Sequence, residues 1–213
     1  MKKIVPQREY EIEIKVINSR FIASLSPAHS VDEARAYIQE IKNRYADAHH
    51  HVPAFVIGHG RSITAHSSDD GEPSGTAGKP ALAVLKGSGF GDVVVVVTRF
   101  FGGTKLGTGG LVRAYGDAVR AVLGITKAAE VILVNHLQMI IPYPHYEVVK
   151  RLLRQGGFES LQEDFTDIVT ISGVVQTAGY ESLCSRLIDI TNGKARINLL
   201  EEMVEKRIPL KEN

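Results

Sequence analysis

The chain has 213 residues, of which 44% are hydrophobic and 23% are charged, a composition that supports folded cores and excludes a disordered chain. Its 25 basic and 24 acidic residues give a net charge of +1, which argues against a strongly cationic nucleic-acid binder. The single cysteine, Cys184, excludes an intramolecular disulfide and a cysteine zinc cluster. No apolar run approaches the roughly 18 residues that span a bilayer, and the first residues lack the apolar core of a signal peptide. We therefore expect a cytoplasmic protein with no membrane partner.

The first part of the chain alternates strand and helix signals. Residues 10–16 alternate charged and apolar side chains, which predicts a half-buried strand, and residues 20–25 are its expected hairpin partner. Ser30 and Glu33 form a Ser-x-x-Glu capping box, so a helix is expected from there to about Tyr45. Shorter strands are predicted over residues 51–57 and 63–66, and a short helix over residues 81–86, with Thr76 as its cap.

The run from Ser68 to Leu123 is the densest mixture of glycine, charge and apolar character in the chain. Five consecutive valines followed by Thr98 lack period-2 alternation, which predicts a strand covered on both faces. A glycine-rich loop over residues 102–110 follows, and then a helix whose apolar residues recur at i, i+3 and i+4. A strand, a flexible loop and a helix N-terminus in this order present backbone N–H groups to an anion.

The charge of this region also indicates a surface that contacts an anion. Residues 73–123 hold six basic and two acidic residues, a local charge of +4. The alternative is that the glycines serve tight turns and close packing while the charges are solvated. One of two adjacent phenylalanines is expected to offer an exposed ring to a base. The predicted anion and nucleic-acid contacts are Lys79, Arg99, Phe100, Phe101, Gly102, Gly103, Lys105, Gly107, Thr108, Gly109, Gly110 and Arg113.

An acidic turn precedes these residues and is expected to form the opposite wall of the site. Its carboxylates are oxygen ligands of the kind that Mg²⁺ prefers, but they can equally cap turns or pair with arginines. The weak metal candidates are Asp69, Asp70 and Glu72, and magnesium is the one cofactor that the sequence leaves open. The residues assigned to this wall are Ser68, Asp69, Asp70, Gly71, Glu72, Thr76 and Gly78.

Other chemistries find less support. Adjacent residues of a strand point to opposite faces, so the run His49-His50-His51 cannot converge on one metal, although His49 and His51 with His66 remain possible ligands. Gly78-Lys79 is followed by Pro80 where a phosphate-binding P-loop needs Ser or Thr. No residue is assigned as catalytic. Hydroxyl groups beside the acidic turn keep an enzyme open as the alternative to a binding protein.

The last part of the chain is predicted to form a second domain. Two apolar helical stripes alternate with four strand signals in the order β-α-β-β-α-β, the ferredoxin-like pattern. A strand over residues 129–134 is expected to end the first domain, and one over residues 137–142 to begin the second. The predicted domains are residues 1–134 and 135–213 of an α+β fold.

Two blocks in the centre of the chain carry a family resemblance. SDDGEPSGTAGKP and VVVTRFFGGTKLGTGGLVRAY resemble the signature of the Impact/YigZ family in order and spacing, and the similarity covers about residues 8–123. Phe100 stands where the family often has Tyr. The resemblance implies a ribosomal-protein-S5-domain-2-like first domain and a ferredoxin-like second domain, a pairing similar to the last two domains of elongation factor G. The extra N-terminal module of eukaryotic relatives, which binds a regulator of a translation-stress kinase, is not carried over.

These observations favour a binding protein that contacts RNA or the ribosome in translation or its regulation. In this interpretation the basic residues meet phosphates and the glycines permit close approach. One alternative is an enzyme, such as a hydrolase, that acts on a phosphorylated metabolite. The other is a protein-interaction module, for which an exposed apolar patch near Phe100 and Phe101 is expected.

Overall fold

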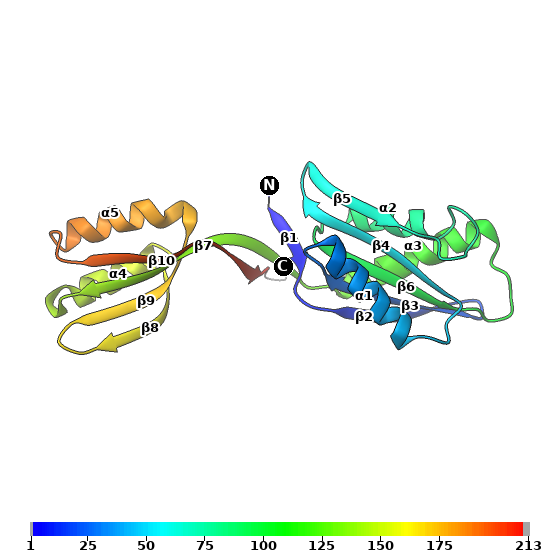
Figure 1. Cartoon of the computed structure of the whole chain (residues 1–213), viewed down its shortest axis with the longest axis horizontal. Helices are drawn as coiled ribbons and strands as arrows, with labels where there is room; N and C mark the ends of the chain where they lie inside the picture. The colour runs from blue at the N-terminus through cyan, green and yellow to red at the C-terminus, as the bar shows by residue number, and fades with distance from the viewer. Residues whose placement is uncertain (1, 211–213) are drawn as a thin grey trace. The chain divides into compact units, whose positions relative to one another are not determined.

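The computed structural model describes residues 2–210, and this part of the chain divides into two compact units (Figure 1). The first unit contains residues up to Glu130 together with residues 208–210, and the second runs from Val131 to Arg207. Both units combine helices with a β-sheet, which confirms the predicted α+β class. The boundary predicted between residues 134 and 135 falls inside a strand. No helix of residues 2–210 is long and apolar enough to cross a membrane.

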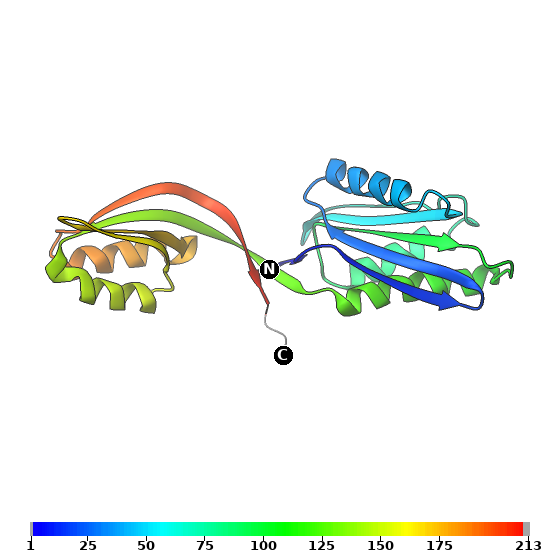
Figure 2. The same ribbon diagram turned by 90° about the horizontal axis from the view of Figure 1, so that it is seen from below.

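An antiparallel sheet in the strand order β2-β3-β6-β4-β5 forms the centre of the first unit. Helix α1 covers one face of this sheet, and α2 and α3 cover the other (Figure 2). The elements of this part of the chain are β1 (Lys3–Pro6), β2 (Tyr10–Val16), β3 (Ser19–Pro27), α1 (Val31–Arg44), β4 (His50–His59), β5 (Ser62–Ser67), α2 (Gly78–Gly87), β6 (Val93–Phe100) and α3 (Gly107–Ile125).

The valine-rich strand β6 is the middle of the sheet, as its sequence predicts. All five valines from Val93 to Val97 are fully buried. Val93, Val95 and Val97 pack into the cluster that includes α2 and α3, whereas Val94 and Val96 pack into the cluster that includes α1. Each valine therefore removes its branched side chain from water on one face or the other, which is the main reason why this strand has no polar alternation.

The two predicted helix caps have different outcomes. The Ser30 hydroxyl accepts a hydrogen bond from the Glu33 N–H (3.1 Å), which confirms the predicted start of α1. The Thr76 cap is wrong. Helix α2 begins at Gly78 after Ala77, and the Thr76 hydroxyl instead donates to the Pro73 carbonyl (2.6 Å). The N–H groups at the start of α2 are bound by a carboxylate from the preceding loop, which is described below.

The second unit follows the order β7-α4-β8-β9-α5-β10 with the sheet order β10-β7-β9-β8, the predicted ferredoxin-like pattern. Helices α4 and α5 lie on the same face of its sheet (Figure 2). Its elements are β7 (Ala128–Ile141), a short 3₁₀ turn η1 (Tyr143–His145), α4 (Tyr146–Gln155), β8 (Glu159–Phe165), β9 (Val169–Gln176), a 3₁₀ turn η2 (Thr177–Gly179), α5 (Tyr180–Ile190) and β10 (Arg196–Pro209).

The two strands predicted over residues 129–134 and 137–142 are a single strand, because β7 continues through Asn135. Asn135 is buried, and its side-chain oxygen accepts hydrogen bonds from the Thr177 hydroxyl (2.9 Å) and the Met203 N–H (3.0 Å). These two partners come from distant parts of the chain and satisfy a polar side chain that would otherwise favour a turn. The tertiary contacts therefore override the local signal.

Burial of β6 leads to a stability prediction. Val95→Thr replaces a buried methyl with a hydroxyl of similar shape that has no partner in the cluster, and we expect the free energy of unfolding to fall by about 1–3 kcal/mol. Val112→Thr is the matched control, since Val112 lies on α3 with 41% of its surface exposed and should change stability little. Urea unfolding followed by circular dichroism measures both. Equal effects of the two substitutions would contradict the burial of β6.

Candidate functional site

A pocket of about 430 Å³ lies in the first unit where four segments meet. The start of β4, the acidic loop after β5, the end of β6 and the start of α3 all contribute to its wall. Its lining therefore joins the two sequence blocks that were predicted to face one another. The lining residues are His49, His50, Glu72, Pro73, Arg99, Phe101, Lys105, Leu106, Gly107, Thr108 and Leu111.

A buried ion pair forms the inner wall of the pocket. The Arg99 Nη1 atom lies 2.6 Å from Glu72 Oε1, and the Tyr115 hydroxyl donates to the same oxygen (2.7 Å). Only 5% of Arg99 and 8% of Glu72 are exposed, so the arginine charge is neutralised inside the protein. Burial, reinforced by the neighbouring Glu72 carboxylate, raises the pKa of Tyr115. The hydroxyl therefore stays protonated and continues to donate.

Arg99 also retains one unused donor. Its Nε atom is buried and has no hydrogen-bond partner within residues 2–210. The guanidinium carbon lies 5.4 Å from the centre of the Phe101 ring and 5.5 Å from that of Phe21. A buried donor without a partner costs free energy, and a bound ligand or water is one way in which proteins satisfy it.

The carboxylates of the acidic loop after β5 bind other parts of the protein. Asp69 accepts hydrogen bonds from the N–H groups of Gly75 (2.8 Å), Ala77 (3.1 Å) and Gly78 (2.8 Å). Partial burial opposes ionisation of Asp69, but these three bonds outweigh it and hold its pKa below the usual value. Its carboxylate therefore occupies the N-terminus of α2.

The other two carboxylates also point to separate partners. Asp70 pairs with Lys42 (2.9 Å) and accepts from the His51 N–H (2.6 Å), while Glu72 holds Arg99. Within residues 2–210 no group of three or more His, Cys, Asp or Glu side chains could hold a metal ion. The three carboxylates thus do not form the convergent oxygen set that magnesium requires.

The N-terminus of α3 differs from that of α2 because no side chain caps it. Leu106 is the N-cap residue and makes no capping hydrogen bond, and Gly107 opens the helix with φ of +72°, a conformation that favours glycine. Both residues line the pocket, as does Thr108. Lys105 is exposed and forms no ion pair within residues 2–210. The pocket therefore combines a positive helix end with a free ammonium group.

Most of the other predicted contacts lie outside the pocket. Lys79 and Arg113 are exposed on α2 and α3. Phe100 faces away, with its ring 6.3 Å from that of Tyr45. At Gly102 an added Cβ would lie 1.8 Å from the Asn18 carbonyl oxygen, so this glycine permits close packing within the protein. The predicted residues that do not line the pocket are Ser68, Asp69, Asp70, Gly71, Thr76, Gly78, Lys79, Phe100, Gly102, Gly103, Gly109, Gly110 and Arg113.

The sequence interpretation missed two histidines of the wall. His49 and His50 both line the pocket because His49 precedes β4 and does not follow the alternation of the strand. His51 turns the other way, with its Nε2 atom 2.9 Å from the Tyr45 carbonyl oxygen, and His66 packs against Phe55. The proposed metal grouping of His49, His51 and His66 is therefore wrong. The histidine run itself was the signal that could have identified this wall.

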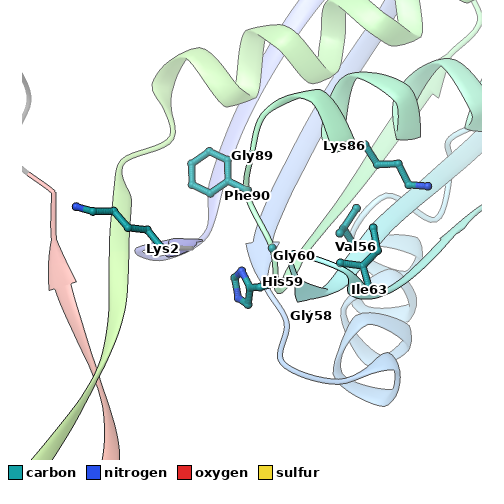
Figure 3. A pocket seen from close by; sticks show the side chains of 10 residues that line it. Lys2, Val56, Gly58, His59, Gly60, Ile63, Lys86, Gly89 and Phe90 are labelled. Carbon is teal, nitrogen blue, oxygen red and sulfur yellow. The ribbon is translucent and has the colours of Figure 1, made fainter. Parts of the chain in front are cut away.

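A second pocket, of about 400 Å³, lies near the opposite end of β4 (Figure 3). Its polar side chains are largely paired with each other or with neighbouring elements. His59 Nε2 lies 2.9 Å from Asp92, which also accepts from the Gly58 N–H (2.7 Å), and Lys2 pairs with Glu130 (3.0 Å). This pocket has fewer unused polar groups than the pocket at α3, which we treat as the candidate site.

Comparison with known proteins identifies the family. The model of the Impact N-terminal domain matches residues 17–123, and a domain of unknown function (DUF1949) matches residues 139–194. An IMPACT family member of Haemophilus influenzae is 36% identical over 93% of this chain and 97% of its own length. The chain belongs to the IMPACT family. Other IMPACT family members are YigZ of Escherichia coli (32% identity, 93% of this chain and 98% of YigZ) and YvyE of Bacillus subtilis (37%, 88% and 86%).

A solved structure supports the same assignment. A crystal structure described as that of a hypothetical protein covers 94% of this chain and 98% of its own, with 33% sequence identity and a TM-score of 0.61. The IMPACT match thus extends through both units, and the resemblance inferred from the two central blocks is confirmed.

The buried pair gives a stability prediction. Glu72→Gln leaves the Arg99 charge in the pocket wall without its carboxylate, and we expect the free energy of unfolding to fall by about 3–5 kcal/mol. Glu13→Gln is the matched control. Glu13 pairs with Arg20 at 2.8 Å, but both side chains are substantially exposed, so its loss should matter little. Thermal and urea unfolding measure the difference, and a mild effect at Glu72 would show that the pair is not structural.

Proposed function

We propose that this IMPACT family protein binds RNA, in translation or its regulation, and that the pocket at α3 holds one nucleotide of the strand. The observation that carries the proposal is that an uncapped helix N-terminus, a free lysine and an exposed aromatic ring line the same pocket. A nucleotide offers the complementary groups, which are an anionic phosphate and a flat base.

The phosphate would bind at the start of α3. The first N–H groups of a helix have no intrahelical acceptor, and the helix dipole favours an anion there. Lys105 adds a full positive charge beside them. Lys79 and Arg113 are exposed on the same unit and are available to phosphates of neighbouring nucleotides. The sequence predicts a phosphate contact for Arg99, but in this proposal Arg99 does not supply the charge for the phosphate, because Glu72 already neutralises it.

The base would stack on Phe101. Phe101 is 39% exposed, the buried Arg99 guanidinium lies 5.4 Å from its ring centre, and the exposed His49 ring packs edge-on at 6.2 Å. These contacts hold the ring in place, so little side-chain entropy remains to be lost on binding. Stacking on an aromatic ring tolerates any base, which suits a partner recognised mainly through its backbone.

A phosphorylated small molecule is the second candidate, because one observation favours it. The pocket volume of about 430 Å³ lies within the usual range for sites that enclose small ligands. Such a ligand would use the same phosphate contacts. A competition experiment distinguishes the two candidates. If the ligand is a phosphorylated small molecule, a mononucleotide or sugar phosphate displaces a bound oligonucleotide completely at comparable concentration.

Charge removal tests the phosphate contact. Lys105→Gln is expected to weaken binding of a single-stranded oligoribonucleotide and to reduce the slope of log affinity against log salt by about 0.7–1. Lys194→Gln removes the same charge from an exposed position in the second unit and should leave the slope unchanged. Fluorescence anisotropy across a salt series measures both variants. An unaltered slope in Lys105→Gln would remove this lysine from the proposed site.

Loss of the aromatic ring tests the stacking contact. Phe101→Leu keeps an apolar side chain but removes the flat surface, and stacking worth about 1–3 kcal/mol corresponds to an affinity about 5- to 150-fold weaker. Phe165→Leu is the control, because Phe165 is 53% exposed in the second unit. The salt slope should not change in either variant. Wild-type affinity in Phe101→Leu would place the base elsewhere.

A further inference from the structure

We propose that His50 recognises the ribose 2′-hydroxyl group, so that the pocket at α3 binds RNA in preference to DNA. This inference rests on the proposed function and adds the sugar to the phosphate and base contacts described above. It follows from the hydrogen bonds that fix the His50 ring and from what they leave unused.

One ring nitrogen of His50 is committed to the protein. Its Nδ1 atom lies 2.8 Å from the Asp70 carbonyl oxygen. A carbonyl oxygen can only accept, so Nδ1 carries the proton. In the neutral ring the other nitrogen, Nε2, must then be an acceptor with a free lone pair.

The protein also holds this ring in position. The Asp70 carboxylate is bound by Lys42 and by the His51 N–H, which fixes the carbonyl that His50 contacts. A Cβ atom added at Gly71 would lie 3.5 Å from His50 Nδ1, so the ring packs closely against this turn. The direction of the Nε2 lone pair is therefore set before a ligand arrives.

The Nε2 atom has no hydrogen bond within residues 2–210. The carboxylate oxygen Glu72 Oε1 lies 3.9 Å from it, which is too long for a hydrogen bond, and this oxygen already accepts from Arg99 and Tyr115. The side chain of His50 is 24% exposed and lines the pocket. An acceptor that is fixed and accessible but unused calls for a donor on the ligand.

His49 offers the opposite hydrogen-bonding character. Its Nδ1 atom accepts from the Phe101 N–H (3.3 Å), so in the neutral ring the proton lies on Nε2, which is a donor. Two adjacent imidazoles of one pocket thus present a donor and an acceptor. A donor suits a phosphate oxygen, whereas the acceptor suits a hydroxyl group.

The ribose 2′-hydroxyl group is the donor that fits this arrangement. The sugar of a nucleotide lies between its phosphate and its base, and α3 and Phe101 provide the contacts for those two parts. Deoxyribose has no hydroxyl at this position, and a 2′-O-methyl group keeps the oxygen but loses the proton. A site that requires the proton therefore distinguishes RNA from both.

The experiment compares three oligonucleotides of identical base and length, made from uridine, deoxyuridine and 2′-O-methyluridine, by fluorescence anisotropy at pH 8 and constant salt. The wild-type protein is expected to bind the uridine strand about 2- to 10-fold more tightly than the other two, the effect of one net hydrogen bond. His50→Asn keeps an N–H group for the Asp70 carbonyl but has no atom in the place of Nε2, so the preference should disappear. His50→Gln can place its amide oxygen near that position and should regain part of it.

His66→Gln, on β5 outside the pocket, is the control and should keep the wild-type preference, and circular dichroism checks that each variant is folded. Equal affinity of the wild type for all three strands would overturn the role of His50 and leave RNA binding intact. Retained preference in His50→Asn would also overturn it. No binding of any strand at low salt would overturn the proposed function itself.

Discussion

The buried contact of Arg99 with Glu72 and Tyr115 is the interaction on which the architecture of the first unit's pocket depends. It joins the end of the central strand, the acidic loop and the middle of α3, three segments that are far apart in the sequence. An arginine so deeply buried needs a carboxylate, and the carboxylate in turn needs donors, so each residue fixes the others. Arg99 and Glu72 of this network line the pocket, so the network determines where the pocket lies.

The contrast between two neighbouring helix ends explains how this region combines stability with binding. Asp69 fills the N-terminus of α2 with a carboxylate from the protein itself, whereas α3 begins without a side-chain cap. The same physical chemistry therefore serves structure at one helix and remains available to an anion at the other. Glycine-rich sequence precedes both helices. The two helix ends differ in whether their N–H groups have a partner in the protein, and this difference decides which end can bind an anion.

Patterns that depend on local spacing could be predicted from the sequence, and contacts between distant segments could not. The valine run of β6, the capping box of α1 and the order of elements in the second unit follow from periodicity and turn residues. The burial of Arg99 depends on Glu72 and Tyr115, which no local pattern pairs with it. For the same reason the sequence predicts two strands on either side of Asn135 where the structure has one. The alternation rule that separates His49 from His50 applies only once β4 has begun.

The central place of β6 also has a consequence for the order in which the first unit acquires its structure. This strand pairs with β3, where Arg20 lies opposite Phe100, and with β4, so the sheet cannot close until residues widely separated in the chain have met. Pairing across such a separation costs loop-closure entropy before it yields contacts, and it slows folding. During synthesis, β3 and α1 are made well before β6, which pairs with β3 and packs against α1. The apolar face of α1 therefore lacks its partners Val94 and Val96 until β6 leaves the ribosome.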